Sequence, residues 1–121
     1  MQILFSLSAA KMNRACCRLG PTMTGQAKDA VDRIAFTIDD RFVEIAANKA
    51  SEGLAAEVQR KGRVSVPSTV MHGVITTLPY FGRKKIQVGF SEGKMRVDSM
   101  VFHHRMIVLT DSTASRRRQS L

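Results

Sequence analysis

The chain has 121 residues, enough for one domain or for two small halves that share a core. Its hydrophobic content of 44% is ordinary for a globular protein and excludes a chain too polar to bury a core. Lysine and arginine outnumber aspartate and glutamate by 19 to 10, which gives a formal net charge of +9. Such an excess is typical of proteins that meet nucleic acid, an anionic membrane surface or an acidic partner.

The cysteines and the apolar runs narrow the setting in which the protein works. Cys16 and Cys17 are adjacent, which disfavours a disulfide between them, and the chain has no third cysteine. This pattern favours a reducing, cytoplasmic setting. The three histidines are not spaced as metal ligands, so we expect no metal and no cofactor. No apolar run could span a membrane, and residues 1–11 lack the basic start of a signal peptide, so no membrane partner is expected.

The first half of the chain predicts a strand, a helix and three further strands. Residues 2–7 alternate apolar and polar side chains as a strand does. Ser8 offers an N-cap for a helix over residues 9–19, which Gly20 and Pro21 end. After a polar stretch, the three strand-like segments are residues 33–38, 41–47 and 53–59.

The second half of the chain repeats this order. Residues 62–66 resemble a strand, and Pro67 suits the first turn of a helix over residues 68–78, which Pro79 ends. The last three strand-like segments are residues 85–90, 94–99 and 101–109.

An internal repeat, over residues 1–59 and 62–109, determines the expected fold more than any single motif does. We predict one α+β domain over residues 1–109, in which two helices cover one face of mainly antiparallel sheet. The last strand of each repeat is expected at a sheet edge. Residues 110–121 have no apolar periodicity and contain an arginine triplet, so they are predicted to form a basic, disordered tail.

Three phrases resemble parts of a known family: MQILFSLSAAKMNRACCRLG, GRVSVPSTVMHGVITTLP and IQVGFSEGKMRVDSMVFHHRMIVL. They resemble the opening strand and helix, the valine-proline entry into the second helix, and the final three strands of a DNA sliding clamp domain. Sliding clamps are the processivity factors of replicative polymerases. Among the sliding clamps, the sequence most resembles the bacterial polymerase III beta subunit.

The resemblance implies a DNA-clamp-like fold without enzymatic activity. Its partners would be double-stranded DNA and DNA polymerase or other replication proteins. Bacterial clamps carry three such domains in each chain and close a ring of six, whereas this sequence contains one. The resemblance therefore implies either a homo-oligomer of six copies or a single domain with another role.

The first predicted helix concentrates positive charge on one side. At about 100° per residue, Lys11, Arg14 and Arg18 fall within a sector about 60° wide, and the apolar residues fall elsewhere. The chain has no acidic residue before position 29, so we expect nothing nearby to neutralise this face. In the clamp family the helices face the DNA backbone, which makes these three cations DNA-binding candidates. A merely solvated basic face is the alternative.

The second predicted helix is uncharged on its outward side, which would present Thr69, His72, Gly73 and Thr76. Cations flank it instead, and they complete the set of DNA-binding candidates: Arg60, Lys61, Arg63, Arg83, Lys84 and Lys85. A neutral helix framed by cations suits a surface that holds phosphates without reading bases. Such binding would be salt-sensitive and tolerant of sequence.

Signals for catalysis are weak. The sequence has no recognisable catalytic triad, phosphate loop or zinc motif. Asp39 and Asp40 are interpreted as a solvated hairpin turn. Tyr80 and Phe81 lie in a turn that could contact a partner. Two other hypotheses stay open: a clamp-fold protein-interaction or regulatory module that does not encircle DNA, and, more distantly, a small enzyme.

Overall fold

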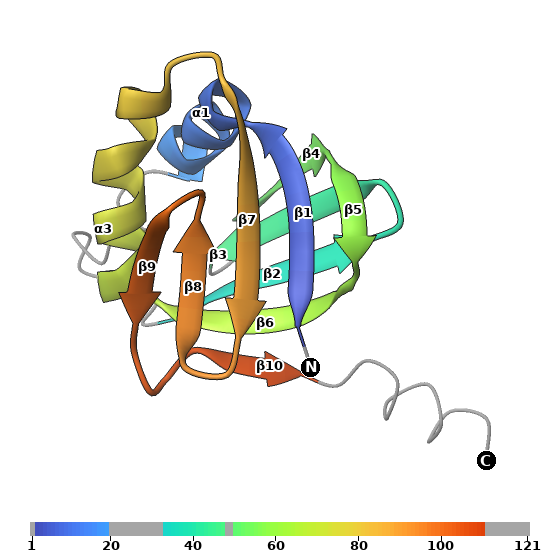
Figure 1. Ribbon diagram of the computed structural model, residues 1–121, viewed down its shortest axis with the longest axis vertical. Coiled ribbons are helices and arrows are strands. Elements are labelled where there is room, and N and C mark those ends of the chain that lie inside the picture. Colours follow the sequence, from blue (N-terminus) through green and yellow to red (C-terminus); the bar gives the residue numbers. More distant parts are fainter. Residues whose placement is uncertain (1, 20–32, 48–49, 111–121) are drawn as a thin grey trace.

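The computed structural model describes residues 2–19, 33–47 and 50–110 of the chain. They form two five-stranded sheets with helices packed beside them, which confirms the predicted α+β class (Figure 1). The predicted tail begins at residue 110, but Thr110 belongs to the last strand. The rest of the tail and the polar stretch before residue 33 lie outside the described residues.

The elements in chain order are β1 (Ile3–Ser8), α1 (Ala9–Leu19), β2 (Arg33–Asp39), β3 (Phe42–Ala47), β4 (Ala50–Ala55), β5 (Glu57–Arg60), β6 (Gly62–Pro67), α3 (Ser68–Thr77), the 3-10 helix η1 (Leu78–Phe81), β7 (Lys85–Ser91), β8 (Lys94–Val97), β9 (Met100–His103) and β10 (Val108–Thr110). The first sheet, called sheet A, has the order β5-β1-β7-β8-β9, and sheet B has the order β10-β6-β2-β3-β4. Every strand pairing in both sheets is antiparallel.

Each repeat contributes to both sheets. The first repeat places β1 and β5 in sheet A and β2 to β4 in sheet B, and the second repeat does the reverse with β6, β10 and β7 to β9. The last strand predicted for each repeat is therefore two strands in different sheets, which is a correction. The predicted strand 53–59 breaks at Ala56, whose N–H donates to the Arg41 carbonyl at 3.1 Å. The predicted strand 101–109 breaks at a turn in which the Ile107 N–H donates to the His104 carbonyl at 3.0 Å.

The prediction that these strands lie at sheet edges is confirmed, because β4, β5, β9 and β10 are the four edge strands. Some element boundaries differ from the prediction. β4 begins at Ala50, three residues before the start of the predicted strand 53–59. α3 ends at Thr77, and the following turn tightens into η1 around Pro79. A proline has no backbone N–H to continue an α-helix, but it fits the start of a 3-10 turn.

The core lies between the sheets and beneath the helices, and aromatic rings join its two sides. The Phe36 ring of sheet B lies 5.1 Å, centroid to centroid, from the Phe90 ring of sheet A. Phe90 also meets Phe5 on β1 at 6.2 Å. These side chains are fully buried, and no polar or charged side chain among the described residues is buried. Burial of apolar surface therefore provides the main attraction between the two sheets.

We predict that Phe90→Ala lowers the free energy of unfolding by about 3–5 kcal/mol, because it removes a ring that two other rings contact and leaves a cavity. Tyr80→Ala is the matched control, since 88% of that side chain is exposed. The control should change stability by less than about 0.5 kcal/mol. Urea titration followed by circular dichroism measures both variants. Equal losses would contradict the proposed core.

The two adjacent cysteines should differ sharply in reactivity. Burial, with a smaller effect from the neighbouring Cys17, raises the pKa of the Cys16 thiol to about 12, whereas Cys17 is exposed. The reactive thiolate of Cys16 is therefore suppressed at neutral and mildly alkaline pH. We expect N-ethylmaleimide to add once to the native protein, at Cys17, and twice after unfolding in urea. Intact-mass and peptide-mass measurements test this, and rapid double addition to the native protein would disprove it.

Candidate nucleic-acid interface

Helix α1 has the two-sided character that its sequence predicts. Its first turn is capped, because the Lys11 N–H donates to Ser8 Oγ at 3.3 Å. One side of the helix packs into the core through Ala9, Met12, Ala15, Cys16 and Leu19. The candidate residues Lys11, Arg14 and Arg18 are all exposed on the other side. The helix therefore presents its cations outward while the apolar side fixes its orientation.

One expectation for this face is wrong. Arg18 is neutralised by Glu52 of β4, with Nη1 and Oε1 3.0 Å apart. These residues lie 34 positions apart, so a search of the nearby sequence could not find the pair. α1 packs against β4, which brings the carboxylate to the end of the helix. Lys11 and Arg14 have no carboxylate partner within the part of the chain that the structure describes.

The exposed side of α3 is uncharged, as predicted, but it is narrower than expected. Thr69, His72 and Thr76 are exposed. Gly73 is half-buried instead, because its backbone lies against the Phe102 ring, and a Cβ placed there would be 3.2 Å from Cε2. The Thr76 hydroxyl donates to the Gly73 carbonyl at 2.8 Å, within the helix itself. α3 thus contributes three small or neutral side chains and no charge.

The structure brings the second cation cluster, which is Arg83, Lys84 and Lys85, to α1. The first residue of the helix, Ala9, donates its N–H to the Lys84 carbonyl at 3.0 Å. Arg83, Lys84 and Lys85 therefore lie beside the N-terminus of α1, and all three are exposed. Two of them have acidic partners: Lys84 lies 3.5 Å from Asp98, and Lys85 pairs with Glu57.

The first cation cluster, which is Arg60, Lys61 and Arg63, lies elsewhere. In the strand register of sheet A, Arg60 lies opposite Leu4, whereas Lys85 lies opposite Ser8 at the other end of β1. Four residues of strand separate these positions by about 13 Å. Lys61 pairs with Asp40 at 3.2 Å, and Arg63 lies on β6 opposite Thr37. Arg60, Lys61 and Arg63 therefore do not frame α3 together with the second cluster, and the nine candidates form two groups.

A groove that the sequence did not reveal lies between α1 and η1. It has a volume of about 400 Å³ and is lined by Ala10, Asn13, Arg14, Cys17, Leu78, Pro79 and Gly82. Tyr80 is the most exposed large hydrophobic side chain described, at 88%, whereas Phe81 packs against the core. Of the two residues in this turn that the sequence suggested as a partner contact, only Tyr80 is exposed. The groove could not be found in the sequence because it depends on packing between α1 and η1.

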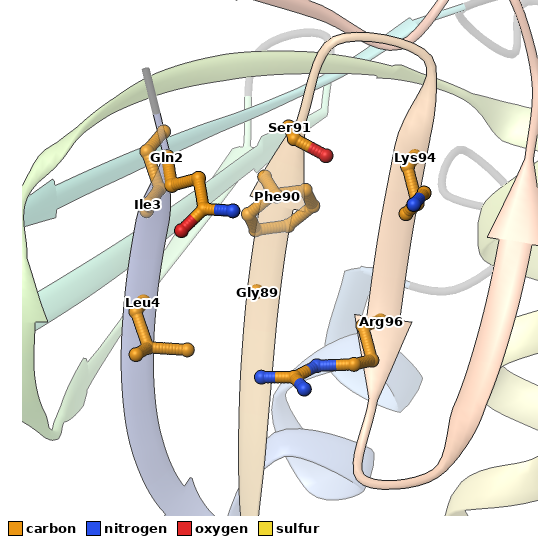
Figure 2. A pocket seen from close by; sticks show the side chains of 8 residues that line it. All are labelled: Gln2, Ile3, Leu4, Gly89, Phe90, Ser91, Lys94 and Arg96. Atoms are coloured by element: carbon orange, nitrogen blue, oxygen red, sulfur yellow. The ribbon is translucent and has the colours of Figure 1, made fainter.

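Sequence reasoning also missed two exposed cations on β8, Lys94 and Arg96. The alternation in KMRV was a sufficient signal, because it places both cations on one side of the strand and Met95 and Val97 in the core. They lie on the outer face of sheet A, where the pocket in Figure 2 is found.

Within the described ranges, no three His, Cys, Asp or Glu side chains gather as metal ligands would. None of the helices there is long and apolar enough to cross a membrane.

Neither a protein-family model nor a curated protein matches the chain. Solved structures do match it. A DNA polymerase sliding clamp from Caulobacter crescentus has a TM-score of 0.65 at 10% identity, over 92% of this chain and 31% of its own. A DnaN sliding clamp (DNA polymerase III subunit beta) from Bartonella birtlesii has a TM-score of 0.68 at 12% identity, over 88% and 30%. The equivalent clamp from Pseudomonas aeruginosa has a TM-score of 0.61 at 10% identity, over 94% and 32%.

These similarities establish the fold. The chain spans about a third of the length of each of these clamps, and identities this low carry no residue-level correspondence. The predicted resemblance is confirmed at the level of architecture, since both helices and both sheets belong to the matched plan. The chain therefore has the fold of a bacterial sliding clamp domain.

Proposed function

We propose that this clamp-like domain binds duplex DNA without sequence preference and without catalysing a reaction. The observation that carries the proposal is the exposed face of α1, where Lys11 and Arg14 have no carboxylate partner among the described residues. The cluster Arg83, Lys84 and Lys85 extends this positive surface at the start of the helix. Such a role places the protein in the cytoplasm, with DNA polymerase or other replication proteins as further partners.

Phosphate binding by this surface would be uneven among its cations. Lys11 and Arg14 can approach phosphates directly. Arg18, Lys84 and Lys85 would have to exchange Glu52, Asp98 and Glu57 for phosphates. Exposed ion pairs contribute only about 0–1 kcal/mol each, so this exchange is feasible but weakens the net gain. Neutral α3 beside the cations allows close approach to the sugar-phosphate backbone without contacts that select a base.

Two double charge reversals test the DNA-binding proposal. Lys11→Glu with Arg14→Glu should weaken duplex binding by more than tenfold and flatten the plot of log affinity against log salt by about two, because each lost phosphate contact contributes about 0.9 to the slope. Arg60→Glu with Arg63→Glu changes the net charge equally, but away from α1, and should cost much less. Fluorescence anisotropy with two unrelated duplexes measures both effects.

Melting temperatures close to that of the parent protein are the control for folding, because all four side chains are exposed. Equal losses from the two pairs of substitutions would mean that affinity follows net charge and not the α1 surface. Affinity that does not change with salt would contradict the proposal as a whole.

We further propose that copies of the domain assemble around DNA through the open edges of their sheets. An exposed strand edge offers unpaired backbone groups to another chain. Val101 on β9 and Val108 on β10 are 44% and 41% exposed, so these two edges offer apolar side chains as well as backbone groups. Six copies of +9 would carry +54, so self-repulsion opposes a ring until DNA or salt screens it. We therefore expect the free protein to be a monomer or a small oligomer at low salt.

A prediction for assembly follows from these edges. Val101→Lys or Val108→Lys places a charge on an edge strand and should reduce DNA-dependent assembly, as measured by light scattering across a salt series on circular duplex DNA. Ser99→Lys adds the same charge in the turn between β8 and β9 and is the control.

A protein that stays monomeric in every condition would exclude the ring. It would favour instead the alternative role, a clamp-fold interaction module that does not encircle DNA. A measurement of duplex binding by the monomer would then distinguish a DNA-binding domain from an interaction module, because the interaction module does not require DNA binding.

A further inference from the structure

The outer face of sheet A carries a pocket of about 280 Å³ that the DNA-binding proposal does not use. Figure 2 shows its position across β1, β7 and β8. Its floor is the backbone of β7 at Gly89, and side chains of β1 and β8 border it. Leu4 of β1 lies on one side of this floor, and Lys94 and Arg96 of β8 lie on the other.

The pocket exists because residue 89 has no side chain. A Cβ built on Gly89 would lie 3.4 Å from Leu4 Cδ1 and 3.8 Å from Arg96 Nη2, which are ordinary contact distances. The space that a side chain would fill is therefore empty, with an apolar wall on one side and a guanidinium on the other. In Figure 2 the Arg96 side chain extends across β7 toward Leu4.

The two cations of the pocket are free to bind an anion. Arg96 donates from Nη2 to Gln87 Oε1 at 2.8 Å, which orients the guanidinium and leaves its other donors available. Lys94 forms no ion pair with any described residue. Their spacing of two residues on β8 places both charges on the same face of the sheet.

The carboxylates on the bordering elements are engaged elsewhere. Glu57 pairs with Lys85. Asp98 lies 3.5 Å from Lys84 and accepts the Gln87 N–H at 2.9 Å. Glu92, in the turn before β8, accepts the Leu109 N–H at 3.2 Å. The positive charge of the pocket therefore has no internal counter-charge among the described residues.

We propose that this pocket binds a carboxylate side chain in an extended, acidic segment of a partner protein. The planar guanidinium of Arg96 can hold a carboxylate through two parallel hydrogen bonds. Leu4 offers an apolar wall for an aliphatic neighbour of that carboxylate. A flexible segment can follow the recess and bring a single side chain to its backbone floor, whereas a duplex presents a broad, rigid, convex surface. Moreover, the pocket lies at Gln2, Ile3 and Leu4, whereas α1 begins after Ser8 at the other end of β1, so the pocket and the α1 cations occupy different parts of the surface.

The experiment uses a fluorescein-labelled peptide of alternating leucine and glutamate, with a leucine-glutamine peptide as the uncharged comparison. Anisotropy at physiological ionic strength should show binding of the acidic peptide alone. Arg96→Gln should reduce its affinity about tenfold or more, because it removes the charge-assisted hydrogen bonds to the carboxylate. Arg41→Gln removes an exposed charge in the turn between β2 and β3 and should cost less than about twofold.

Gly89→Ala is the decisive variant, because it adds a methyl group to the floor of the pocket, between Leu4 and Arg96, without changing the charge. Its Cβ meets only ordinary contacts, so the melting temperature should be retained, and duplex DNA binding should be unchanged. Peptide affinity should nevertheless fall by about tenfold. Lys94→Gln provides a second measurement that does not depend on how Gly89→Ala folds, and should cost several-fold more than Arg41→Gln.

Two results would overturn the proposal. If Arg96→Gln, Lys94→Gln and Gly89→Ala lose no more than Arg41→Gln, the peptide binds by diffuse attraction to the basic surface. If single-stranded oligothymidine displaces the peptide and loses affinity in the same three variants, the pocket takes phosphate of a nucleic acid instead. Neither result depends on whether the duplex binds at α1, because Gly89→Ala leaves that surface intact.

Discussion

The contact between Phe36 of sheet B and Phe90 of sheet A joins the two sheets. The apolar core around it determines which side chains must stay at the surface. These rings and their neighbours fill the space between the sheets with apolar groups, and none of the described charged side chains is buried there. A charge without a partner in such a core would cost several kcal/mol. The many lysines and arginines of the described chain are therefore at the surface, and the alternation of each strand or helix decides on which face each one lies.

The surface that results is not uniformly available to an anion. Pairs between distant residues neutralise some cations: Arg18 with Glu52, and Lys85 with Glu57. Among the exposed cations that have no carboxylate partner in the described residues, two groups lie at the proposed sites: Lys11 and Arg14 on α1, and Lys94 and Arg96 on the outer face of sheet A. The first is a protruding helix face and suits the backbone of a duplex. The second is recessed, bordered by an apolar side chain, and suits a flexible acidic chain.

The clamp fold brings these two faces together on one small domain. Because each repeat exchanges strands with the other sheet, β1 and β7 lie side by side at the centre of sheet A. The same pairing places Lys85 next to the end of β1 and hence next to the start of α1. A protein that held DNA on α1 would still expose the outer face of sheet A to other proteins. The two proposals are thus compatible, although each can fail without the other.

The sequence by itself determined the features that depend on local periodicity. The apolar and basic sides of α1, the buried alternation of β1 and the doubled order of elements follow from side-chain spacing, which a helix or strand displays in any tertiary setting. The tertiary structure alone decided the rest. Ala56 and the turn before Ile107 redirect the chain between sheets, although each lies inside a segment that the sequence predicts as one strand. Glu52 reaches Arg18 only because β4 packs on α1, and Gly73 is half-buried only because Phe102 covers it. These contacts join residues far apart in the chain, and no local pattern specifies which distant neighbour packing will supply.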